Sequence, residues 1–201
     1  MQGSGREEDI GGWERLDAAR NRRLLLGTAL AIVSEAGVDA LTMDDLARRA
    51  GVGKGTVFRR FGSRAGLMQA LLDHAQRGFQ ESYMRGPAPL GPGAQPLERL
   101  HAFGQARIRA LEITGELRRA AAVDGFTHHR HATRQLELLH LTMLLSAVPA
   151  VRDPELTAYQ LEAFLEAGLL LHLHRTAGMP LDRIIDGWTG LVASVTGSSE
   201  G

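Results

Sequence analysis

The chain of 201 residues contains no cysteine. Disulfide bonds, thiolate metal sites and cysteine nucleophiles are therefore excluded together. Long apolar runs are missing too, because no segment approaches the ~18 apolar residues that a membrane-spanning helix needs. The polar N-terminus, MQGSGREEDIGGWER, lacks the apolar segment of a secretory signal. We expect a soluble, cytoplasmic protein that makes no membrane contact.

Lysine is almost as scarce, since Lys54 is the only one beside 22 arginines. The net charge is zero, yet residues 20–64 carry nine basic and four acidic side chains, a local surplus of +5. Such a surplus indicates a polyanionic partner for one end of the molecule, with a solvated charged surface as the alternative. The hydrophobic content of 44% is ordinary for a globular protein with a packed core.

Strand-like alternation is absent, whereas helical periodicity recurs along the chain. Thr42 precedes two aspartates, as expected at a helix start, and Gly51 suits a tight helix end. Residues 86–96, GPAPLGPGAQP, hold four of the seven prolines and indicate a loop or hinge. We expect an all-α protein of about nine helices, with an irregular tail over 1–19 and helices near 22–36, 43–50, 53–61, 64–85, 97–113, 116–124, 128–147, 154–177 and 181–196.

The segment GVGKGTVFRRF (51–61) permits two interpretations. A phosphate-binding loop requires G-x-x-x-x-G-K-[ST] between a strand and a helix. Here Arg48 occupies the first glycine position, Gly55 occupies the hydroxyl position, and the preceding DDLARRA has a helical pattern. Gly53 and Lys54 fit the motif, but the nucleotide-binding interpretation fails at these three other requirements.

A helix-turn-helix accounts for the same residues. The small apolar face of Leu46, Ala47 and Ala50 allows close helix crossing, and Gly51 makes the turn. We expect Val52, Val57 and Phe61 to point inward. The residues then left outside or at the exposed helix start are Lys54, Gly55, Thr56, Phe58, Arg59 and Arg60. A basic surface helix without a partner is the alternative.

Residues 20–73 resemble the DNA-binding domain of the TetR (tetracycline-repressor) family. The resemblance is carried by the helix end Ala29–Gly37, by LTMDDLARRAGVGKGTVFRRF and by FGSRAGLMQALL. It implies an N-terminal three-helix DNA-binding domain and a C-terminal helical ligand-binding and dimerisation domain over 74–201. Family members bind palindromic operators as homodimers and usually release DNA when a small ligand binds. An activator or global regulator of the same fold remains an alternative to a repressor.

The resemblance also assigns roles by position. Lys54 and Gly55 would approach bases, Thr56 and Phe58 would line the groove, Arg59, Arg60 and Arg64 would hold phosphates, and Thr42 and Met43 would approach the DNA backbone. Three residues depart from the family pattern. Phe58 stands where Tyr is usual, Gly53 replaces a Ser or Thr cap, and Gly66 replaces an acidic residue.

The last helices have the apolar pattern of an interface. The segment LEAFLEAGLLLHLH is apolar nearly all round, which indicates burial on two sides. The apolar residues over 181–195 form an uninterrupted stripe at helical spacing. We expect a dimer interface across these two segments, with a thicker monomeric core as the alternative. Its candidate residues are Phe164, Leu165, Gly168, Leu181, Ile184, Ile185, Trp188, Leu191, Val192 and Val195.

A ligand pocket is expected among helices 97–177. Its candidate residues are Phe103, Ile108, Leu111, Phe126 and His131. The histidines His128, His129 and His131 lack the i, i+4 pairing or carboxylate partners of a metal site, so no metal or cofactor is predicted. An enzyme that uses these histidines is the alternative from another class, although no nucleophile–base–orienter set accompanies them.

Overall fold

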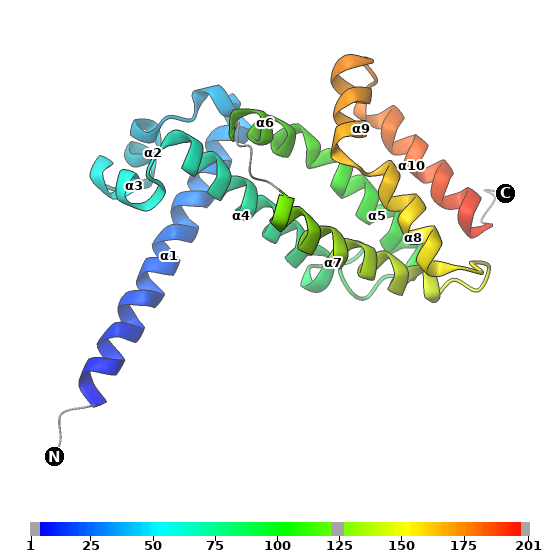
Figure 1. Ribbon diagram of the computed structural model, residues 1–201, viewed down its shortest axis with the longest axis horizontal. Helices are drawn as coiled ribbons and strands as arrows, with labels where there is room; N and C mark the ends of the chain where they lie inside the picture. Colours follow the sequence, from blue (N-terminus) through cyan, green and yellow to red (C-terminus); the bar gives the residue numbers. More distant parts are fainter. Residues whose placement is uncertain (1–4, 122–126, 198–201) are drawn as a thin grey trace. The chain divides into compact units, whose positions relative to one another are not determined.

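The computed structural model describes residues 5–121 and 127–197 (Figure 1). Every regular element within them is helical, which confirms the all-α prediction. The elements are α1 (Gly5–Ala36), the 3-10 turn η1 (Val38–Ala40), α2 (Met43–Ala50), α3 (Lys54–Phe61), α4 (Arg64–Arg85), α5 (Pro96–Arg109), α6 (Leu111–Ala121), α7 (Thr127–Ser146), α8 (Pro154–Phe164), α9 (Ala167–Leu171), the π-helical turn η2 (His172–Thr176) and α10 (Leu181–Thr196). None of these helices is both long and apolar enough to cross a bilayer.

Two segments differ from the sequence-based expectation. The tail predicted over 1–19 is helical from Gly5 onward, because its Glu, Arg, Ala and Leu residues favour a helix even without an apolar stripe. The single helix expected over 154–177 is broken after Phe164. There the carboxylate of Glu166 accepts a hydrogen bond from the Leu169 amide (3.0 Å) and starts α9 as a new helix.

The chain forms two compact units. The first contains the residues up to His74 together with the end of α6 from Leu117. The second runs from Ala75 to Glu116 and continues from α7 onward. Helix α4 therefore begins in the first unit and ends in the second.

The first unit is built on the buried face of α1. Helix α1 packs against α2, and α2 packs against α3. The apolar periodicity of α1 is used as expected, since Leu26, Ala29 and Val33 are buried. The other large buried side chains of this unit include Leu25, Ile32, Leu41, Leu46, Val57, Phe61, Leu67, Met68, Leu71 and Leu72.

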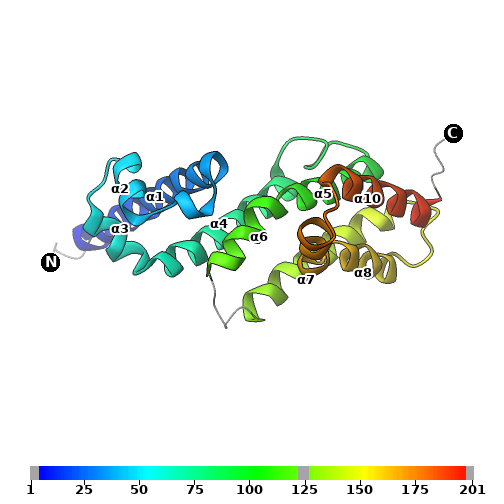
Figure 2. The ribbon, with the colours of Figure 1, turned by 90° about the horizontal axis from the view of Figure 1, so that it is seen from above.

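The core of the second unit depends on close packing of α5 against α10, which lie side by side in both views (Figures 1 and 2). The fully buried Trp188 lies directly over Gly104, so that any Cβ at position 104 would overlap the indole. The indole Nε1–H donates to the carbonyl of Leu100 (3.2 Å). A glycine on one helix thus makes room for the largest side chain on the other.

This packing corrects part of the predicted dimer interface. Leu165, Ile184, Ile185, Trp188 and Val192 are each at most 7% exposed, because the chain's own core surrounds them. Their side chains are not available to a second subunit. The remaining candidates keep some accessible surface: Phe164, Leu181, Leu191 and Val195 are half-buried and Gly168 is exposed.

We expect Gly104→Ala to destabilise the protein by about 1–3 kcal/mol, because the added methyl group forces Trp188 or the α5 backbone to move. Thermal or urea unfolding measures the effect. Gly78→Ala on α4 is the matched control, since a Cβ there meets nothing within 4 Å. Equal stability of the two variants would contradict this account of the core.

Candidate nucleic-acid interface

Helix α2 and the turn after it are fixed by local hydrogen bonds. The side chain of Thr42 caps α2 by accepting from the Asp45 amide (3.0 Å). At the other end Gly51 is left-handed (φ 67°, ψ 30°), a conformation that glycine adopts at little cost. The amide of Val52 then donates to the carbonyl of Ala47 (3.0 Å), and the Gly51 amide donates to that of Arg48 (3.3 Å). This is a Schellman motif, which turns the chain sharply into α3.

Helix α3 is anchored by its apolar side. Val57 is fully buried and Phe61 is 8% exposed, while Val52 before the helix is half-buried. This orientation leaves the opposite side and the N-terminal end accessible. Lys54, Gly55, Phe58, Arg59 and Arg60 are exposed, and Thr56 is half-buried.

The exit from α3 explains one departure from the family pattern. Gly62 has a positive φ (74°), and the hydroxyl of Ser63 accepts from the Gly66 amide (3.1 Å) at the start of α4. A Cβ at position 66 would overlap the carbonyl of Phe61. Glycine therefore fits this junction, where the acidic residue usual in the family would not fit without a backbone shift.

Lys54 is held at the tip of α3 by two neighbours. Its ammonium donates to Asp44 of α2 (2.8 Å) and lies 5.9 Å from the ring centroid of Phe58. Both partners of the ion pair are largely exposed, with side-chain exposures of 61% and 64%. Exposed pairs of this kind contribute about 0–1 kcal/mol. The pair can therefore exchange for a contact with an outside anion at little cost.

Several other cationic side chains of residues 20–64 already form ion pairs with carboxylates of the same unit. Arg48 bonds Asp45, and Arg49 donates to Glu35 (2.6 Å), whose carboxylate raises the pKa of this guanidinium. Among the described residues no ion pair involves Arg20, Arg22, Arg23, Arg59 or Arg60. Arg59 contacts the Thr56 hydroxyl (3.5 Å), and Arg22 lies over the ring of Phe61 (5.6 Å).

Two predicted DNA contacts are modified by the structure. The guanidinium of Arg64 donates to the carbonyls of Val38 (3.0 Å) and Leu41 (3.4 Å), so it ties α4 to the segment before α2. Its first role is structural. Met43 is only 7% exposed, because its side chain joins the core. Only its peptide N–H, in the first turn of α2, remains for a phosphate.

The predicted ligand residues divide into two groups. Phe103, Ile108 and Leu111 are buried in the core of the second unit. Phe126 and the side chains of His128, His129 and His131 lie outside the described residues. Where the structure describes the chain, no three His, Cys, Asp or Glu side chains form a metal-binding group.

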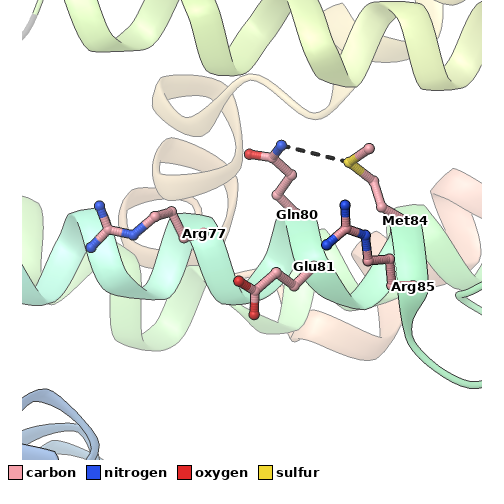
Figure 3. A pocket seen from close by; sticks show the side chains of 5 residues that line it. All are labelled: Arg77, Gln80, Glu81, Met84 and Arg85. Carbon is pink, nitrogen blue, oxygen red and sulfur yellow. Dashed lines mark hydrogen bonds between the residues drawn. The ribbon is translucent and has the colours of Figure 1, made fainter. Parts of the chain in front are cut away.

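A pocket along α4 is lined by Arg77, Gln80, Glu81, Met84 and Arg85. Figure 3 shows that all five side chains project from this one helix, where Gln80 contacts the sulfur of Met84 (3.6 Å). Because a single helix supplies the whole lining, this pocket is an open surface groove and does not resemble an internal ligand chamber.

The capped α2, the Schellman turn and the outward basic side of α3 define a helix-turn-helix protein. Residues 25–71 match the family model described as bacterial regulatory proteins, tetR family. The match identifies a TetR-type DNA-binding domain over these residues.

Two curated relatives and a solved structure are similar to this chain. The chain is 35% identical over 91 residues to the HTH-type transcriptional repressor KstR of Rhodococcus jostii, a match covering 45% of this chain but only 41% of that protein. It is 26% identical over 136 residues to the HTH-type transcriptional regulator BetI of Paraburkholderia phymatum, covering 67% and 68% of the two chains. The crystal structure of a transcriptional regulator from Rhodococcus sp. Rha1 shares the fold, with a TM-score of 0.62, 19% identity and coverages of 87% and 95%.

We expect Arg64→Ala to destabilise the first unit by about 1–2 kcal/mol, because a charged donor to two backbone carbonyls is lost. Arg64→Lys should restore little of this stability, since lysine lacks the forked donors. Arg60→Ala, on the exposed side of α3, is the control and should leave unfolding unchanged. An Arg64→Ala variant with wild-type stability would return this residue to a pure phosphate-binding role.

Proposed function

We propose that the protein is a DNA-binding transcriptional regulator, and specifically a repressor that binds a palindromic operator as a homodimer and is released by a small molecule. The observation that carries the proposal is the exposed, cation-bearing N-terminal end and outer side of α3. The match of residues 25–71 to the TetR family model and the names of KstR, a repressor, and BetI, a regulator, support it.

The geometry suggests how α3 binds a DNA major groove. A Cβ at position 55 would meet nothing within 4 Å in the protein, so Gly55 leaves its backbone open to close approach by the duplex. Lys54 exchanges Asp44 for a guanine edge or a phosphate. Phe58, 41% exposed, offers an apolar contact to a thymine methyl group.

Phosphate contacts then fix the position of α3 on the duplex. Arg59 and Arg60 in the last turn of α3 are suited to this role. On α2, the Thr42 oxygen accepts from the Asp45 amide, which leaves its own O–H hydrogen to donate to a phosphate beside the Met43 amide.

The accessible surface of α8 and α10 suggests where the second subunit packs. Leu156 and Tyr159 on α8 are 55% and 48% exposed, and Ala163 follows one turn later on the same side. Helix α10, which contacts α8, exposes the small residues Gly187, Gly190 and Ser194. Two subunits joined through this surface would place two recognition helices to bind half-sites ~34–36 Å apart.

The rest of the proposal concerns the protein's chemistry and location. Both named relatives are regulators. We therefore propose a regulator without catalysis that acts where the DNA is, in the cytoplasm. Measurement of transcription from the bound promoter distinguishes an activator from a repressor.

We expect Gly55→Ala to weaken operator binding by about 1–3 kcal/mol, because the methyl group separates the backbone from the bases. Folding stability should be unchanged or slightly higher, because alanine favours a helix and the position is open. Fluorescence anisotropy with a fragment selected from genomic DNA measures binding, and Gly27→Ala on α1 is the control.

We expect Lys54→Ala to reduce discrimination between operator and random DNA in the same binding assay, because the contact of Lys54 with a guanine edge is lost. Equal, salt-insensitive affinity of the wild type for both DNAs would contradict the proposal.

We expect a Leu156→Asp/Tyr159→Arg double variant to sediment as a monomer while the wild type sediments as a dimer. Both side chains are exposed in one chain, so folding of the subunit should persist. Leu139→Asp on α7, where the leucine is 66% exposed, is the control for a lost surface hydrophobe. A wild-type monomer at micromolar concentration would contradict the dimer.

A further inference from the structure

Two buried polar atoms on neighbouring rings in the core of the second unit have no hydrogen-bond partner among the described residues. Tyr83 on α4 is 2% exposed and His140 on α7 is 8% exposed. Within the described part of the chain, neither the Tyr83 hydroxyl nor His140 Nε2 has a hydrogen-bond partner. A buried polar atom without a partner is unfavourable and uncommon in a native core, so each atom calls for a partner.

Aromatic rings surround these two atoms. The rings of Tyr83 and His140 lie 4.5 Å apart between centroids with an interplanar angle of 37°. Phe103 of α5 lies 5.5 Å from His140 and 5.3 Å from Tyr83, and Phe79 lies 5.4 Å from Tyr83. We call Phe79, Tyr83, Phe103 and His140 the aromatic cluster. It offers flat apolar surfaces next to a hydroxyl and an imidazole nitrogen.

Three charged side chains lie beside the aromatic cluster, and Arg99 is bound to the backbone carbonyl of Tyr83 (3.0 Å). Arg107 and the buried Glu137 lie 3.5 Å apart between Nε and Oε2, and the Arg107 guanidinium lies over Phe79 at 5.9 Å. Burial raises the pKa of Tyr83 to about 12. Burial, and then the charge of Arg99, lowers the pKa of His140 to about 4. At neutral pH the four side chains of the cluster thus present an intact hydroxyl and a neutral imidazole.

We propose that the aromatic cluster is the effector site and that its ligands are phenols, which are neutral planar molecules bearing one hydroxyl. The inference rests on the proposed function and gives the chemical class of its effector. The ring of a phenol stacks in the cluster, while its hydroxyl pairs with the Tyr83 hydroxyl and with His140 Nε2. A carboxylate or an ammonium would lose its hydration in this buried cluster, and the ammonium would also meet the positive charges of Arg107 and Arg99.

The test uses the full chain without DNA and three probes that share one ring system: 2-naphthol, 2-naphthoate and naphthalene. Calorimetric titration should show saturable binding of 2-naphthol, and binding at least tenfold weaker for the anion and for the hydrocarbon. Tyr83→Phe should weaken 2-naphthol by about three- to tenfold, the effect of one hydrogen bond. Ser146→Ala, which removes an exposed hydroxyl at the end of α7, is the control and should bind like the wild type.

Thermal unfolding of the same variants separates a binding role from a structural one. Removal of an unpaired hydroxyl should leave the melting temperature of Tyr83→Phe unchanged or higher. A lower melting temperature would show that the hydroxyl is satisfied within the fold and would overturn the proposal. So would the absence of saturable 2-naphthol binding, a preference for 2-naphthoate, or equal binding by Tyr83→Phe.

Operator binding measured without probe keeps the two proposals distinct. A wild type that binds operator but not 2-naphthol overturns the effector class and leaves the regulator intact. A wild type that binds 2-naphthol through Tyr83 but no operator overturns the proposed regulator and leaves the small-molecule site.

Discussion

Burial of Val57 and Phe61 beneath α3 is the constraint on which the candidate interface depends. Helix α3 has eight residues, fewer than an isolated helix needs to be stable in water. Its conformation therefore comes from packing and from the Schellman turn at Gly51. Once those two side chains are buried, helical geometry determines that Lys54, Phe58, Arg59 and Arg60 face outward. The outward position of the cationic side chains of α3 therefore follows from the burial of its apolar side chains.

The sequence predicted this region well because the determinants are local. A threonine cap, two aspartates, a glycine at the helix end and apolar residues at helical spacing define α2 and α3 without reference to distant parts of the chain. The roles of Arg64 and Met43 were less predictable. Arg64 bonds carbonyls 23 and 26 residues away, and no local pattern reveals such partners. The charge surplus was counted correctly, but its division into paired and unpaired cations required coordinates.

In the second unit the sequence predicted which residues are apolar but not what covers them. The stripe containing Ile184, Trp188 and Val192 fits a dimer interface and a monomer core equally well. The decisive feature is Gly104, more than eighty residues earlier in the chain, which admits the indole of Trp188. The proposed effector site shows the same limitation. The adjacent histidines at 128–131 are conspicuous in sequence, whereas Tyr83 and His140 are ordinary single residues that only the fold brings together.

Polar groups that could bind a partner are exposed in the first unit and buried in the second. This difference suits DNA as the partner of the first unit and a small molecule as the partner of the second. In the first unit the ion pairs are largely exposed, so an exchange of Asp44 for a DNA phosphate at Lys54 changes the free energy little in either direction. Such contacts suit a reversible complex whose strength comes from many weak, salt-sensitive interactions. In the second unit the hydroxyl of Tyr83 and the imidazole of His140 are withheld from water. A ligand that pairs with them there does not compete with solvent, so a small molecule with few atoms can bind with useful affinity. Exposure thus favours a large polyanion at α3, and burial favours a small neutral molecule between α4, α5 and α7.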